Sequence, residues 1–332
     1  MPNPEEERWI EERRKVIEEW SDANPHSNVP TTRIPNPMHG MLRAVDQTPT
    51  KKYSIELRFP DGPLTSQTTL PGSVHPARRG SAGTANGHYF QNQDPLIEEI
   101  LNEDYSEEMK TVASTMTPVQ PSSLDMLVSR CLCRPKPHME SHSLKRERNL
   151  LLALSTVSYC NASTSQWALL RSFYTSVAAL VLDPPNLVSD CPRKGNHWQD
   201  VGFQGTDPAT DFRGTGILGL IQLYCMAKDL PEGKLAEIVH MSRQEPHDFP
   251  LAVVGINITA ILINSLRQGE LLESAVTVGG YLKAMNKLYQ SSLLVFCEQW
   301  REQNCTVKDC QSLLNRITSL LRNSQQTLLK SS

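Results

Sequence analysis

The chain has 332 residues, a formal net charge of −3, 39% hydrophobic residues and eight cysteines. A slightly acidic chain with no basic stripe is not expected to bind nucleic acid. Because there is no signal peptide and no apolar run near the ~20 residues that span a bilayer, we expect a cytoplasmic protein with reduced cysteines and no transmembrane segment.

The first predicted element is an amphipathic helix within residues 1–22. Its apolar residues share one helical side: Trp9, Ile10, Val16, Ile17 and Trp20. Seven glutamates against three arginines and one lysine between Glu5 and Trp20 disfavour binding to an anionic membrane. We expect this segment either to dock on a protein surface or to stay solvated and partly formed, because ~16 residues are marginal as an isolated helix.

Residues 23–130 are predicted to be disordered or a linker. Sixteen of the 23 prolines lie in residues 1–140, and Asn24–Gly87 is rich in Pro, Gly, Ser and Thr. Such a composition seldom buries enough apolar surface to offset the entropy lost on ordering. Tyr53–Phe59 alternates apolar and polar residues as a strand does, but nothing nearby would pair with it.

A small set of cysteines and histidines follows, at Cys131, Cys133, His138 and His142. These residue types bind zinc, but Cys-x-Cys followed so soon by histidine lacks the long loop that separates ligand pairs in known fingers. We therefore expect no metal site and place the start of the folded domain here, at residue 131.

The second half of the chain is predicted to be all-α, a single domain over 131–325 with a short tail over 326–332. Apolar residues recur at helical spacing in six stretches besides the one described next. These stretches are Leu144–Tyr159, Trp167–Val181, Leu235–Val239, Leu251–Leu262, Leu282–Phe296 and Leu313–Leu321. No alternating strand pattern competes with this interpretation, so a helical domain of about seven helices is expected.

The most informative stretch is residues 195–224, GNHWQDVGFQGTDPATDFRGTGILGLIQLY. Thr210 or Asp211 is a suitable N-cap for the apolar helix that follows, which would place Arg213 in or just before the first turn. The helix dipole disfavours a cation at that place, so local stability does not explain Arg213. Gly214 and Gly216 leave it without bulky neighbours, an arrangement suited to an approaching phosphate.

This run resembles the signature of the ELMO domain, and most of all that of the stand-alone ELMO domain-containing proteins, the third vertebrate paralogue among them. The matching residues are Trp198, Gly202, Phe203, Gln204, Gly205, Pro208, Thr210, Asp211, Phe212, Arg213, Gly214, Gly216, Gly219 and Leu220. The resemblance extends from about Leu144 to about Leu321, where outside the signature it rests on the helical pattern.

The resemblance implies a GTPase-activating protein for Arf/Arl-family small GTPases in their GTP form. Arg213 would be the catalytic arginine finger, which enters the partner's nucleotide pocket. The chain would then have no reaction centre and no cofactor of its own, because GTP and Mg²⁺ belong to the partner. Its place would be in the cytoplasm, peripheral on membranes or the cytoskeleton only through that partner.

Several alternatives stay open from the residues themselves. Arg213 would have a purely structural role if it were buried and paired with Asp207 or Asp211. Gln204 would either orient the attacking water or, as we favour, bracket the turn, and Trp198 and Phe203 are expected to be core anchors. The whole protein would be a non-catalytic adaptor, binding small GTPases or their exchange factors, if the Pro-rich first half carries its function.

Overall fold

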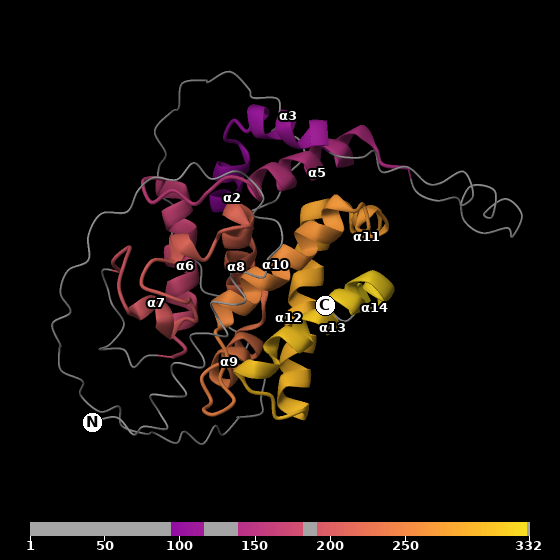
Figure 1. Ribbon diagram of the computed structural model, residues 1–332. Coiled ribbons are helices and arrows are strands. Elements are labelled where there is room, and N and C mark those ends of the chain that lie inside the picture. Colours follow the sequence, from indigo (N-terminus) through magenta and orange to yellow (C-terminus); the bar gives the residue numbers. More distant parts are fainter. Residues whose placement is uncertain (1–93, 116–138, 182–190, 331–332) are drawn as a thin grey trace, which may run out of the picture. The chain divides into compact units, whose positions relative to one another are not determined.

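The computed structural model describes residues 94–115, 139–181 and 191–330, which all fall within one folding unit. These residues form helices and turns with no strand among them, which confirms the all-α prediction (Figure 1). The predicted helix at 1–22, the candidate strand at 53–59 and three of the four zinc-type residues lie outside the described residues.

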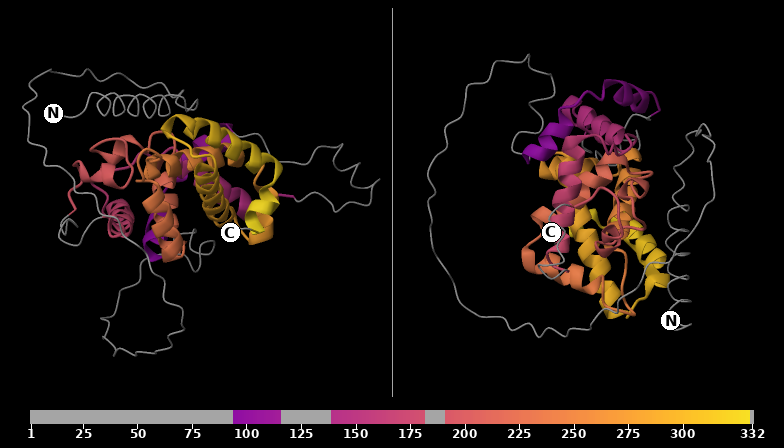
Figure 2. Two further views of the ribbon diagram at one scale, coloured as in Figure 1. Left: turned by 90° about the horizontal axis from the view of Figure 1, so that it is seen from below. Right: turned by 90° about the vertical axis from the view of Figure 1, so that its left-hand side faces the viewer.

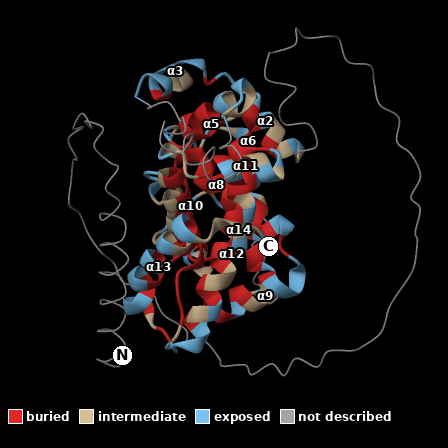
Figure 3. Cartoon of the chain, turned by 90° about the vertical axis from the view of Figure 1, so that its right-hand side faces the viewer, coloured by how far each residue is buried: buried red, intermediate tan, exposed pale blue. Residues whose placement is uncertain are grey.

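Three long helices form the centre of the fold. They are α8 (Gly216–Asp229), α10 (Leu251–Arg267) and α12 (Tyr281–Glu302), and each packs against the other two. Every residue of α8 from Gly216 to Ala227 is buried, so this helix has no solvent face along most of its length. The buried residues run through the middle of the helical array in Figure 3.

Seven more of the described helices surround this centre. They are α5 (His142–Leu154), α6 (Thr164–Ala178), α7 (His197–Asp200), α9 (Glu232–Met241), α11 (Leu272–Val278), α13 (Cys310–Asn323) and α14 (Gln325–Lys330). Of these, α6 covers α8, whereas α11, α13 and α14 cover α12 (Figure 2). Among the described helices, no single one is long and apolar enough to cross a membrane; α10 and α11 pass that test only as a pair, bent by 101°.

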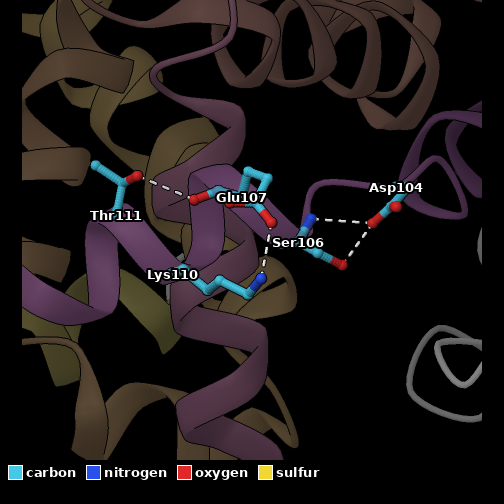
Figure 4. A network of polar contacts seen from close by, with 5 residues as sticks. All are labelled: Asp104, Ser106, Glu107, Lys110 and Thr111. Atoms are coloured by element: carbon cyan, nitrogen blue, oxygen red, sulfur yellow. Dashed lines mark hydrogen bonds and ion pairs between the residues drawn. The ribbon is translucent and has the colours of Figure 1, made fainter.

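Residues 94–115 correct the linker prediction for 23–130, because they form α2 (Pro95–Leu101) and α3 (Ser106–Thr115). The side chain of Asp94 accepts a hydrogen bond from Leu96 N–H at 2.8 Å and caps α2. Helix α2 packs on α6 and buries Ile97, Ile100 and Leu101. At the start of α3, Asp104 accepts hydrogen bonds from the backbone N–H and the hydroxyl of Ser106 (Figure 4). Few apolar residues are present here, but tertiary contacts bury them.

The predicted tail over 326–332 is also corrected, since α14 occupies most of it. Leu328 is buried, and its carbonyl accepts a hydrogen bond from the hydroxyl of Ser291 on α12 at 2.7 Å. The folded domain therefore extends at least to Lys330.

Helix α8 begins at Gly216, later than the predicted N-cap at Thr210 or Asp211. Gly216 has φ +53°, and a Cβ atom there would lie 2.5 Å from the carbonyl oxygens of both Leu154 and Val157. The next amide, Ile217 N–H, donates to the Val157 carbonyl at 3.1 Å. The helix therefore starts where its backbone meets the end of α5, and its N-cap residue, Thr215, makes no side-chain capping bond.

We predict that Ile100→Ala lowers the free energy of unfolding of the whole domain by about 2 to 5 kcal/mol, the usual cost of a buried Ile-to-Ala truncation. Ile100 is 0% exposed. Chemical denaturation measures the loss, with the exposed Glu99→Ala as the matched control on the same helix. An unchanged midpoint for Ile100→Ala would mean that α2 does not belong to the cooperative unit.

Gly216→Ala should destabilise the domain by at least about 2 kcal/mol. The methyl group costs free energy twice, because the backbone has a left-handed φ and because two carbonyl oxygens occupy its place. Gly205→Ala is the control within the same motif, because no atom lies within 4 Å of a Cβ built there. Thermal unfolding of the two variants should differ clearly. Equal melting temperatures would show that α8 can start without this backbone contact.

Candidate functional site

The candidate site is the motif loop, which we define as residues 195–215. It leads from α7 through a turn and the short 3₁₀ helix Pro208–Thr210 to the start of α8. Gly202 anchors it to α10: its φ is +89°, a Cβ atom there would lie 2.3 Å from Leu251 N, and its carbonyl accepts a hydrogen bond from Val253 N–H at 3.1 Å. At its other end, Gly216 at the start of α8 packs against the end of α5, so the loop is fixed to the core at two places.

An aromatic cluster lies beneath the loop. Trp198, Phe203 and Phe212 are at most 3% exposed. The ring of Phe203 lies 5.6 Å from that of Trp198 and 5.8 Å from that of Phe212, centre to centre. Phe173 of α6 meets Phe203 edge to face at 6.0 Å. Trp198 and Phe203 are therefore core anchors, as predicted.

Two aspartates, Asp207 and Asp211, stabilise the part of the loop between residues 204 and 211. Asp207 accepts a hydrogen bond from Ala209 N–H at 3.1 Å, where the buried Pro208 starts the 3₁₀ helix, and forms an ion pair with Lys194 at 2.6 Å. Asp211 accepts a hydrogen bond from Gln204 N–H at 2.7 Å. These side chains stabilise the loop's own backbone instead of capping α8, which is why the predicted N-cap is wrong.

The Thr210 hydroxyl lies between two acceptors. It is 2.8 Å from the carbonyl oxygen of Asp207 and 3.1 Å from Oδ1 of Asp211, so its single proton is shared between them. Burial raises the pKa of the Asp211 carboxyl, while the hydrogen bonds from Gln204 and Thr210 and the charge of Arg213 act in the opposite direction.

Arg213 is exposed and only lightly held. Its Nε–H donates to the carbonyl oxygen of Thr210 at 2.9 Å. Within the described residues it makes no ion pair, and neither Nη group has a hydrogen-bond partner. The alternative in which Arg213 is buried and paired with Asp207 or Asp211 is therefore wrong.

The two glycines near Arg213 have different surroundings. Gly214 is exposed, with φ +87°, and leaves the neighbourhood of the guanidinium open. Gly216 is buried against α5, so its role is packing and not access to Arg213, which corrects that part of the prediction.

Gln204 brackets the loop through its backbone. Its N–H binds Asp211, and its carbonyl accepts a hydrogen bond from the side chain of Gln199 at 3.4 Å. These bonds make the Gln204 backbone part of the turn, whereas a role of its side chain in orienting water stays a prediction. Lys194, which pairs with Asp207 from 13 residues away, could not be predicted from the sequence, because spacing alone does not show which cation an aspartate will meet.

Arg213 lies on the surface and does not line either of two cavities among the described residues. A cavity of about 430 Å³ between α3 and α5 and one of about 310 Å³ between α9 and α12 are lined by other residues. In the described part of the chain, no group of three or more His, Cys, Asp or Glu is placed to hold a metal ion. What the loop offers chemically is an exposed guanidinium with two Nη groups that no described residue binds, suited to an anion supplied by another molecule.

Comparison with known proteins matches the ELMO/CED-12 family over residues 149–314, half of the chain. Human ELMO domain-containing protein 3 is 26% identical over 306 residues, which cover 91% of this chain and 76% of the human protein. The mouse protein of the same name is 28% identical over 259 residues, 78% of this chain and 65% of its own length. ELMO domain-containing protein B of Dictyostelium discoideum is 38% identical over 104 residues, 31% of this chain and 36% of its own.

No solved structure matches the chain. The matched family region contains the whole motif loop, and the most extensive of these alignments spans 91% of the chain. The chain therefore belongs to the ELMO/CED-12 family.

Proposed function

We propose that this protein is a GTPase-activating protein for Arf/Arl-family small GTPases and that Arg213 is its arginine finger. The observation that carries the proposal is an exposed arginine that forms no ion pair with any residue the structure describes and is held on a loop fixed to the core. A guanidinium of this kind, placed in a partner's nucleotide pocket, neutralises the charge that develops between the β- and γ-phosphates. Lysine lacks the planar fork that makes this contact.

The reaction takes place in the partner. GTP, Mg²⁺ and the attacking water belong to the GTPase in its GTP form, and this chain supplies a charge in trans without a cofactor of its own. The surface position of Arg213, away from both described cavities, supports a role in which the side chain enters another protein's site. Membership of the ELMO/CED-12 family and the resemblance of residues 198–220 to the family signature also support it.

The second candidate is a non-catalytic adaptor that binds small GTPases or their exchange factors. Its support is the composition of the first half, which holds 16 of the 23 prolines within residues 1–140. Proline-rich segments act as extended spacers and as recognition sequences. The two candidates differ in what they require of Arg213, so one substitution separates them.

Arg213→Ala and Arg213→Lys should abolish the acceleration of GTP hydrolysis, a loss of about 10³-fold or more, because the finger accounts for about 10³ to 10⁵ in rate in other small GTPases. Single-turnover hydrolysis by a panel of Arf/Arl GTPases measures this. The melting temperature should stay unchanged, since an exposed side chain with one hydrogen bond contributes little to stability.

The matched control is Arg316→Lys, which makes the same replacement at an exposed position on α13. It should keep full activity. Binding of a GTPase without any acceleration by the wild type would favour the adaptor. Unfolding of both Arg213 variants would instead identify the arginine as a structural element.

A further inference from the structure

The starting point is how Arg213 is held. Its Nε–H donates to the Thr210 carbonyl, so the guanidinium is attached through one nitrogen, and neither Nη group has a hydrogen-bond partner among the described residues. Nothing else among the described residues restrains it. The direction of the guanidinium therefore depends on where the loop holds the carbonyl of residue 210.

That carbonyl lies in a segment closed by one carboxylate. Asp211 reaches back seven residues to accept the Gln204 N–H at 2.7 Å, a charge-assisted bond, and shares the Thr210 hydroxyl at 3.1 Å. Asp211 is half-buried and forms no ion pair with any described residue. These hydrogen bonds, together with the charge of Arg213, compensate for its lost hydration, and the bonds close residues 204–211 into a turn.

We propose that Asp211 is the positioning residue for Arg213: by closing residues 204–211 it fixes the Thr210 carbonyl that orients the guanidinium. This inference rests on the proposed function. Asp211 itself does not touch the partner or the reacting atoms; it acts through the backbone of Gln204 and Thr210. A side chain already ordered before it meets the partner loses less conformational freedom in the transition state.

The kinetic test separates rate from binding. Asp211→Ala should lower the maximal single-turnover rate about 10- to 30-fold, the penalty of ordering a free arginine, while the half-saturating concentration changes less than about 3-fold. Asp211→Asn should recover most of the rate, because its amide oxygen still accepts the Gln204 N–H. Glu302→Ala, which removes an exposed carboxylate at the end of α12 and outside the motif loop, is the control and should behave as wild type.

The second readout does not need a GTPase. The Nε–H signal of Arg213 in the free full-length protein, assigned by its loss in Arg213→Lys, should exchange slowly with solvent in the wild type and in Asp211→Asn. In Asp211→Ala it should exchange fast. If Asp211 only contributes to global stability, the exchange rate should not differ between Asp211→Ala and the wild type, because it is measured under conditions where all variants are folded.

The outcomes are distinct. If the wild type accelerates hydrolysis and Asp211→Ala does so equally, the positioning role is overturned and the proposed function stands. If no GTPase is accelerated by the wild type, the proposed function fails, and this role fails with it. If Asp211→Asn loses as much rate as Asp211→Ala while its Nε–H stays protected, the carboxylate charge and not loop closure is responsible, which also overturns the proposal.

Discussion

The close backbone contact between the end of α5 and the start of α8 is the constraint on which the rest of the site depends. Gly216 sits where a side chain would collide with two carbonyl oxygens, and Ile217 N–H bonds one of them. Because α8 is buried almost throughout, its first residue cannot move without disturbing the core. The exit of the motif loop is therefore set by packing at the centre of the domain.

The second anchor makes the loop a bridge between helices. Gly202 meets the start of α10 as closely as Gly216 meets the end of α5, and the aromatic rings beneath the loop fill the space between them. A loop held at two backbone contacts has few conformations left, so its exposed tip is ordered by the same interactions that stabilise the fold. The packing of the core therefore determines the position of a functional residue on this loop, although that residue contributes little to stability itself.

Much of the architecture could be predicted from the apolar pattern, because the long helices each bury one or more complete stripes. The pattern did not predict α2 and α3, in which only a few residues such as Ile100 and Val112 are buried by neighbouring helices. It also misplaced the start of α8. Thr210 and Asp211 are the right residue types for an N-cap, but which backbone N–H they meet is decided by the docking of Gly216, a contact between segments about 60 residues apart.

At the site, too, the sequence indicates which residue types matter, but only the structure shows which partners they bind. Arg213 stands out in the sequence by its glycine neighbours and its motif, whereas only the three-dimensional arrangement shows that no carboxylate in the described part of the chain pairs with it. Asp207 meets Lys194, and Asp211 meets a backbone amide, so both acidic groups beside the arginine are engaged within the loop. With these two carboxylates committed in this way, Arg213 keeps two Nη groups that no described residue binds, and they suit an anion supplied by another molecule.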